Sequence, residues 1–383
     1  MTKLRLPLLH YFSREEESKK PLKDFVLLLI QHLLGDSKAF ISALEAAGAE
    51  RDKLIIVGIP YSSKDNIVSD LRKDYKVYSP RTYPFDNEVR KALSEAFGLC
   101  SREKQLIIIE DGGYATPMIH QVFENYIKYC RGAIEQTTNG IWRIEESILK
   151  EGIKLGFPVI SIPDCKLKQE LEPHFIGEAV VRNTQMLISE EGLFIRGKKI
   201  GIVGYGTIGS KIADETKKQQ AIVSISEINP VKLISARLAG FETKSLLNLV
   251  KESDIIIGAT GRKSIGREQI LSLKNNAILV NASSKRIEID VEELEKLCLS
   301  KEPTKIGTWY ELVNGNKVLL LADGFPVNFF SSESVPDKAI DPILTLMFLG
   351  AIRIAKENLE PKIHKCPIQE DEIAKLFSEI HFT

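Results

Sequence analysis

Short runs of apolar residues recur along this chain, and each is followed by a turn and a segment of helical periodicity. The runs are apolar at every position rather than at alternate positions, which is typical of strands covered on both faces. Their alternation with helical segments predicts an α/β protein with parallel sheets. The expected strands are Val26–Ile30, Leu54–Ile59, Leu106–Glu110, Pro158–Ile162, Lys199–Val203, Ile222–Ser226, Asp254–Gly258 and Ala277–Asn281.

The order of these segments predicts two domains, as a length of 383 residues also suggests. Residues 1–182 form one series of strand–helix units, and residues 183–332 form a second. Residues 333–383 have a helical pattern with no clear new strand. We expect these C-terminal helices to return to the first domain, which would make that domain discontinuous.

The segment Gly197–Pro230 has the pattern of a strand–helix–strand unit that binds a dinucleotide. A strand leads into Gly204, Gly206 and Gly209, and a helix begins at about Thr207. The first glycine permits the tight turn, the second lets a pyrophosphate approach the backbone, and the third lets helix and strand pack closely. Free N–H groups at the helix N-terminus, which include those of Thr207, Ile208 and Gly209, favour the phosphates.

An acidic residue, Glu227, follows the second strand of this unit, 18 residues after Gly209. A carboxylate there accepts hydrogen bonds from the adenosine ribose hydroxyls and repels a 2′-phosphate. The expected cofactor is therefore NAD rather than NADP, in a Rossmann domain. Ligands of parallel sheets lie at the carboxyl ends of the strands. Further cofactor contacts are thus expected at two later strand ends, namely Thr260, Gly261, Asn281, Ala282 and Ser283.

Composition narrows the class of protein. Lysine plus arginine equals aspartate plus glutamate, at 52 each, so no overall charge recruits nucleic acid or an anionic membrane. The longest apolar run, Phe25–Leu34, is too short to span a bilayer, and the N-terminus lacks the features of a signal peptide. The five cysteines show no CxxC pair, which argues against a disulfide framework or a metal site and suits a cytoplasmic protein. Cys165 is interpreted as a buried thiol and His174 as a surface residue.

Several motifs, taken together and in order, resemble the S-adenosylhomocysteine hydrolase (adenosylhomocysteinase) family. They are KPLKDFVLLLIQHLL at Lys20–Leu34, EDGGYATP at Glu110–Pro117, GAIEQTTNGI at Gly132–Ile141, the glycine turn with EINP, ATGRKSIGREQI, NASSKRIEID, and NGNKVLLLADGFPVN at Asn314–Asn328. The resemblance implies a two-domain enzyme that closes around NAD. Family members oxidise a ribose 3′-hydroxyl of a nucleoside thioether, release the 5′ thiolate, add water and return the hydride. The resemblance also implies a nucleoside-like small-molecule substrate and a homo-oligomer.

Carried over to matching positions, the resemblance implies a role for several residues. His32 and Asp111 fall on substrate-contacting positions, and Lys168 falls on the catalytic lysine that meets the 3′ oxygen. The implied contacts on the nicotinamide side are Thr137, Thr138, Asn139 and Asn328.

The chain departs from the family pattern on the substrate side. Gln136 replaces a catalytic glutamate, and it can still hydrogen-bond ribose hydroxyls. Glu172 replaces an aspartate and can act through a longer arm. Tyr114, Ser284 and Val335 replace an aspartate and two histidines. The C-terminal lysine and tyrosine that family members lend to a neighbour are missing.

Two other interpretations stay open at this point. The first is a non-catalytic paralogue that binds NAD and regulates a partner, which the replacements at Gln136, Ser284 and Val335 favour. The second is an NAD-dependent dehydrogenase of the 2-hydroxy-acid type, in which Arg286 lies two residues from the position where such enzymes carry an arginine.

Overall fold

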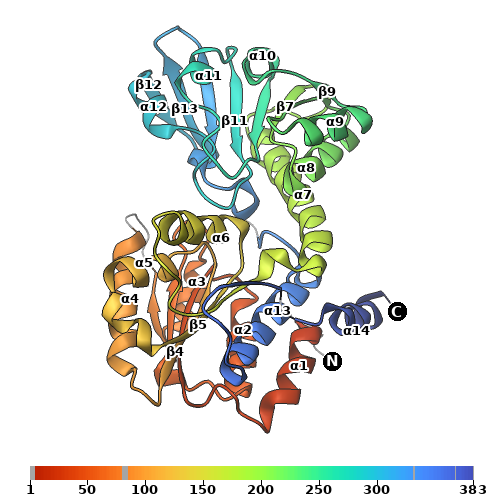
Figure 1. Ribbon diagram of the computed structural model, residues 1–383. Coiled ribbons are helices and arrows are strands. Elements are labelled where there is room, and N and C mark those ends of the chain that lie inside the picture. Colours follow the sequence, from red (N-terminus) through yellow and green to blue (C-terminus); the bar gives the residue numbers. More distant parts are fainter. Residues whose placement is uncertain (1–4, 80–84, 331–332, 367, 383) are drawn as a thin grey trace. The chain divides into compact units, whose positions relative to one another are not determined.

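The chain separates into two units, each built around its own sheet, in a computed structural model that describes residues 5–79, 85–330, 333–366 and 368–382 (Figure 1). Unit 1 comprises residues 1–171 and 336–383, and unit 2 comprises residues 172–335. The boundary near residue 171 falls inside one long helix, α7 (Lys166–Ser189), whereas the sequence pattern placed it at residue 182. The α/β class with parallel strands is confirmed.

Unit 1 contains a seven-stranded sheet in the order β15-β6-β5-β4-β1-β2-β3, and every pairing in it is parallel. Its strands are β1 (Phe25–Gln31), β2 (Leu54–Gly58), β3 (Lys76–Tyr78), β4 (Gln105–Glu110), β5 (Cys130–Glu135), β6 (Val159–Ser161) and β15 (Ile363–Lys365). Its helices besides the start of α7 are α1 (Pro7–Glu17), α2 (Ser37–Ala46), α3 (Asp65–Leu71), α4 (Phe85–Leu99), α5 (Ala115–Val122), α6 (Thr138–Ile144), α13 (Asp337–Lys356) and α14 (Glu370–Phe382).

Apolar strands buried on both faces hold this sheet. On one face, alternate residues of β1 such as Val26 and Leu28 pack with Val89 and Leu93 of α4. On the other face lies α13, which contacts β4, β5 and α2. The N-terminus of α1 is capped by the buried carboxylate of Asp341 in α13. The strand-forming runs therefore become the central layer, as continuous apolar patterns predict.

We expected no strand near the C-terminus, and this expectation is wrong because β15 pairs with β6 at the edge of the sheet. Its three residues are too few to give a periodic signal. The pairing places the chain next to Cys366 alongside the end of β6, where α7 is about to begin.

Unit 2 contains an eight-stranded sheet in the order β12-β13-β14-β11-β10-β7-β8-β9. The strands from β14 to β9 pair in parallel, and β12 and β13 add an antiparallel edge. The strands are β7 (Lys199–Val203), β8 (Ile222–Ser226), β9 (Glu242–Thr243), β10 (Ile255–Gly258), β11 (Ala277–Asn281), β12 (Cys298–Pro303), β13 (Gly307–Leu312) and β14 (Lys317–Leu321). The helices are α8 (Thr207–Lys218), α9 (Pro230–Leu238), α10 (Leu246–Glu252), α11 (Arg267–Leu271) and α12 (Val291–Lys296).

The strand order of unit 2 reverses between β7 and β10, because β8 lies on one side of β7 and β10 on the other. Helices cover both faces: Val180 of α7 and Ile212 of α8 belong to one core cluster, and Leu249 of α10 and Leu294 of α12 belong to the other. A reversal of this kind marks the crevice where a dinucleotide binds. Among the described residues, none of the helices has the length and apolarity needed to cross a bilayer.

Candidate functional site

Three predicted site residues of unit 1 follow three neighbouring strands. His32 comes directly after β1, Asp111 after β4 and Gln136 after β5. The strands are adjacent and parallel, so their carboxyl ends meet at one edge of the sheet. The strand order also reverses between β4 and β1, which is where ligands of open parallel sheets bind.

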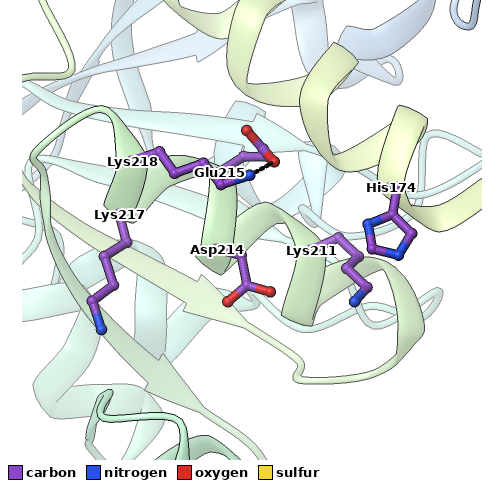
Figure 2. Close-up of a pocket in the computed structure, with 6 residues that line it drawn as sticks. All are labelled: His174, Lys211, Asp214, Glu215, Lys217 and Lys218. Carbon is purple, nitrogen blue, oxygen red and sulfur yellow. Dashed lines mark hydrogen bonds and ion pairs between the residues drawn. The ribbon is translucent and has the colours of Figure 1, made fainter.

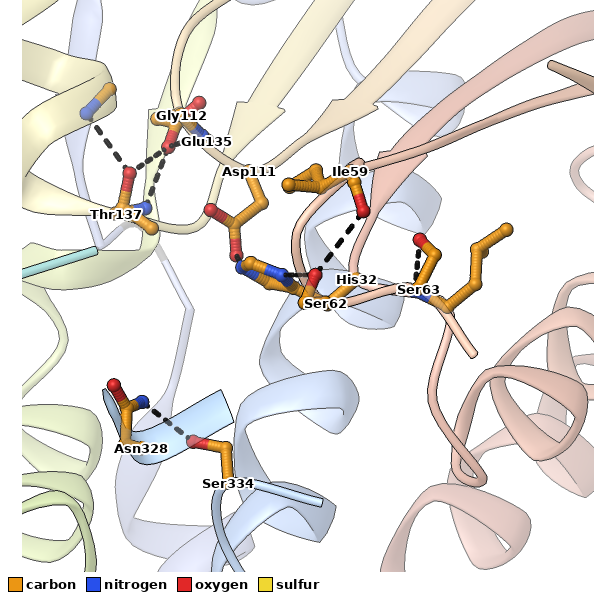
Figure 3. A network of polar contacts seen from close by, with 12 residues as sticks. His32, Ile59, Ser62, Ser63, Asp111, Gly112, Glu135, Thr137, Asn328 and Ser334 are labelled. Atoms are coloured by element: carbon orange, nitrogen blue, oxygen red, sulfur yellow. Dashed lines mark hydrogen bonds and ion pairs between the residues drawn. The ribbon is translucent and has the colours of Figure 1, made fainter. Parts of the chain in front are cut away.

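His32 and Asp111 form a buried pair. The Nε2 atom of His32 lies 3.4 Å from a carboxylate oxygen of Asp111, and the Nδ1 atom contacts the hydroxyl of Ser62 (Figure 3). Burial lowers the pKa of His32, and the negative charge of Asp111 opposes this effect only in part. The imidazole is therefore neutral near pH 7 and can accept a proton. Sequence reasoning missed Ser62, which has no distinguishing pattern around it.

A second buried carboxylate, Glu135 at the end of β5, holds the loop that follows Asp111. It accepts hydrogen bonds from the backbone N–H groups of Gly112 and Gly113 at 3.0 and 2.8 Å, and from the backbone and hydroxyl of Thr137 at 2.7 and 2.6 Å (Figure 3). Burial, followed by the charges of Glu110 and Asp111, raises the pKa of Glu135 to about 8. Glu135 thus fixes two predicted site segments to each other.

The segment after β5 contains four of the predicted residues. Gln136 is buried, and its Oε1 atom has no hydrogen-bond partner among the described residues. Thr137 caps α6 by accepting from the N–H of Gly140 at 3.0 Å. Thr138 is exposed and Asn139 is half-buried. Buried polar atoms usually have partners, so the Gln136 oxygen fits a hydroxyl or amide supplied by a ligand.

Lys168 lies in the first turn of α7 with only 7% of its surface exposed. That turn is held by the C-terminal part of the chain. Glu370 of α14 accepts hydrogen bonds from the backbone N–H groups of Lys166 at 3.0 Å and of Leu167 at 2.6 Å. An acidic side chain at a helix N-terminus both satisfies free N–H groups and matches the helix dipole.

The expectation that no disulfide forms, with Cys165 as a buried thiol, is wrong. Cys165, directly before α7, is joined to Cys366 by a disulfide across a separation of 201 residues. Spacing along the chain does not reveal such a partner, because the pairing of β15 with β6 creates the proximity. Cys100, Cys130 and Cys298 are free thiols.

The part of α7 in unit 2 carries Glu172 and His174. Glu172 is half-buried, and His174 is exposed. His174 lines a hollow of about 350 Å³ with charged residues of α8 that include Lys211 and Asp214 (Figure 2). None of the charged side chains around this hollow was a predicted site residue, and Glu172 does not line it.

The glycine turn of unit 2 has the predicted conformation. Gly204 has a φ of 95°, a conformation that other residues rarely adopt. A Cβ on Gly209 would lie 2.1 Å from the carbonyl oxygen of Gly204, so only glycine permits this contact between helix and turn. A Cβ on Gly206 would meet only the Nζ atom of Lys232, at 3.7 Å, so the space above the turn is open. Helix α8 begins at Thr207, and Ile208 is in its first turn.

Glu227 follows β8 and is tied to the turn. Its carboxylate accepts from the backbone N–H of Tyr205 and from that of Asn229, each at 2.7 Å. Each carboxylate oxygen keeps a second acceptor site. The acid is thereby oriented at the edge of the glycine turn, where a ribose hydroxyl would donate to it.

The loops after β10 and β11 meet at one buried carboxylate, Glu288, which sequence reasoning missed. It is fully buried and accepts from the predicted residues Thr260, Gly261 and Ser283. The side chain of Asn281 donates to the carbonyl oxygens of Lys285 and Gly324 and accepts from the N–H of Ser283, so its polar atoms are used within the protein. Ala282 is buried between these two positions.

Asn328 is buried and half satisfied. Its amide nitrogen donates to the hydroxyl of Ser334 at 2.9 Å (Figure 3), whereas its Oδ1 atom has no partner among the described residues. The backbone around it is fixed by Asn183 of α7, which donates to the carbonyl oxygens of Val327 and Asn328. An unpaired amide oxygen of this kind fits the N–H₂ group of a carboxamide.

Together, the open glycine turn, the oriented Glu227 and the unpaired oxygen of Asn328 fit an NAD molecule in unit 2. These features, on a sheet whose strand order reverses at β7, define an NAD-binding α/β protein of the Rossmann class. The contacts of Thr137, Thr138 and Asn139 with the cofactor stay predictions, because these residues belong to unit 1.

Comparisons with known proteins give the family. Residues 176–334 match the family model of the S-adenosyl-L-homocysteine hydrolase NAD-binding domain. The adenosylhomocysteinase of Thermotoga maritima is 31% identical over 378 residues, which cover 96% of this chain and 89% of that protein. The S-inosyl-L-homocysteine hydrolase of Methanopyrus kandleri is 29% identical over 374 residues, with 96% and 85% covered. The chain belongs to the adenosylhomocysteinase family, and NAD is its cofactor.

A solved structure shows a similar fold. It is one of the chains of dipicolinate synthase from Bacillus halodurans, and it aligns over 88% of this chain and 100% of its own length, with a TM-score of 0.50 and 13% identity. At that identity the likeness concerns the fold alone.

Proposed function

We propose that this protein hydrolyses S-adenosylhomocysteine, or a nucleoside thioether of the same kind. The sequence similarity to adenosylhomocysteinases over nearly the whole chain carries this proposal. Bound NAD supplies a hydride acceptor for a ribose hydroxyl and returns the hydride at the end of the cycle. The protein must then bind the ribose, move protons and exclude water.

Proton transfer is assigned to residues at the start of α7 and at the strand ends of unit 1. Lys168 is buried, and an ammonium group in such a place can exchange a proton with a nearby oxygen. His32 is neutral beside Asp111 and can take a proton from a sugar carbon or give one to a leaving group. Gln136 cannot act as a base, and its unpaired oxygen accepts a ribose hydroxyl. Glu172 supplies a further carboxylate.

The base of the substrate has two precedents among the relatives. One relative carries the name adenosylhomocysteinase and another the name S-inosyl-L-homocysteine hydrolase, and both are about equally similar to this chain. The two bases differ by an amino group against a carbonyl at one ring position. We assign the protein to a nucleoside thioether with a purine base, acting in the cytoplasm as a homo-oligomer, without nucleic-acid or membrane partners.

The test is release of homocysteine, followed with a thiol reagent, from S-adenosylhomocysteine and S-inosylhomocysteine in separate reactions. We expect turnover with at least one of them, together with transient absorbance in the reduced nicotinamide band. Lys168→Ala should reduce the rate by about 10²–10⁴. The matched control is Lys166→Ala, because Lys166 is exposed and lies two residues away in the same turn. Absence of thiol release with both substrates would refute the proposal.

A further inference from the structure

The carboxylate of Glu288 is a point at which two loops of unit 2 are joined. One oxygen accepts from the backbone N–H groups of Thr260 at 2.5 Å and Gly261 at 2.6 Å, and also contacts the hydroxyl of Ser283. The other oxygen accepts from the hydroxyls of Thr260 at 2.8 Å and Ser264 at 2.7 Å. Glu288 has no exposed surface. These donors offset the cost of burying a charge.

The surroundings of Glu288 are built around it. A Cβ on Gly258, the last residue of β10, would lie 2.7 Å from the Cβ of Glu288, so the close approach requires a glycine. The backbone of Glu288 is fixed as well, because its carbonyl oxygen accepts from the N–H groups of Ser264 and Ile265 at 2.9 Å each. The side chain therefore reaches the ends of β10 and β11 from a rigid support.

These two strand ends belong to one half of the dinucleotide site. The glycine turn and Glu227 follow β7 and β8, and this half receives the ADP part of the cofactor. Strands β10 and β11 lie on the other side of the reversal and form the second mononucleotide half. The loops held by Glu288 therefore line the half that receives the nicotinamide nucleoside.

We propose that Glu288 is a positioning residue for the nicotinamide half of the NAD site. It acts through Thr260, Gly261 and Ser283, whose backbone and hydroxyl groups it fixes at the ends of β10 and β11. The inference rests on the NAD site of unit 2 and does not depend on which thioether the enzyme hydrolyses. Removal of Glu288 should loosen one half of the cofactor site and leave the other half intact.

The experiment compares two ligands on the full chain freed of nucleotide. ADP probes the half with the glycine turn, and NAD⁺ probes both halves. Glu288→Gln keeps one acceptor oxygen, whereas Glu288→Leu has a similar volume and keeps none. By calorimetric titration we expect the Kd for NAD⁺ to rise in the order wild type, Gln, Leu, with the Leu variant weaker by about tenfold or more, as expected for unpaired buried donors. The Kd for ADP should stay within about twofold.

The matched control is Glu292→Gln, because Glu292 is exposed on α12, close to Glu288 in sequence. It should bind both ligands as the wild type does. Equal weakening of NAD⁺ and ADP by the Glu288 variants would mean general damage to unit 2 and would overturn the proposal, as would unchanged affinity for both. Normal NAD⁺ behaviour with no thioether hydrolysis would instead count against the proposed function alone.

Discussion

The disulfide between Cys165 and Cys366 allows a quantitative prediction for the variant Cys366→Ser. The closed loop spans 201 residues, and chain entropy alone then gives a stabilisation of about 5 kcal/mol. If unit 2 stays folded while unit 1 unfolds, only residues 166–171 and 336–365 of the loop are released. A flexible loop of roughly 36 residues gives about 4 kcal/mol. Measured effects are usually smaller, so we expect a loss of about 2–4 kcal/mol from unit 1.

The assay uses the two tryptophans, because Trp142 lies in unit 1 and Trp309 in unit 2. The variants Trp309→Phe and Trp142→Phe each leave a fluorescent reporter in one unit. For a domain of unit 1's size, 1 kcal/mol corresponds to roughly 2–4 °C in Tm. Cys366→Ser should therefore lower the transition seen by Trp142 by about 4–16 °C and leave that seen by Trp309 unchanged.

Reduction of the wild type should have the same effect as the substitution, with the thiol state read by mass spectrometry after alkylation. Cys298→Ser removes a free thiol of unit 2 and serves as the control. If the Trp142 transition of Cys366→Ser coincides with that of the oxidised wild type, the reasoning is refuted. A shift in the Trp309 transition of equal size would also refute it, because unit 2 has its own core.

Three further outcomes follow from the buried polar groups. Because the pKa of Glu135 is raised to about 8, unfolding free energy should fall as pH rises from about 4.5 through about 8; Glu135→Gln should flatten this dependence in thermal melts, and the exposed control Glu124→Gln should not. Asn328→Ala should weaken NAD⁺ binding by about tenfold without changing ADP binding, measured by titration calorimetry. Asp111→Asn removes the charge that raises the pKa of His32, so an NMR titration should show that pKa lower still; an unchanged value would contradict the pairing.

The sequence predicted the features that depend on long or local patterns. The eight apolar runs are all strands, and the glycine turn, α8 and Glu227 lie where the motif placed them, because strand burial and turn geometry are encoded in neighbouring residues. The short strands β3, β9 and β15 were missed, since two or three residues cannot show a period.

The features that depend on distant contacts were not predictable from the pattern. The partner of Cys165 lies 201 residues away, and only the pairing of β15 with β6 brings it near. Glu135 and Glu288 are fully buried, yet in sequence they look like any acidic residue of a solvated loop. What identifies them is the set of N–H and hydroxyl donors around each carboxylate, and that set is assembled from separate strand ends.

The discontinuity of unit 1 has a consequence for how the protein is made. Asp341 of α13 accepts from the backbone N–H groups of Leu8 at 3.0 Å and Leu9 at 2.9 Å, so the first helix is completed by one of the last. On the ribosome, unit 2 is synthesised whole before α13 emerges, and it can fold first. The sheet of unit 1 must wait for the end of translation with the face that α13 covers still exposed, and this is the period in which the nascent chain most needs a chaperone.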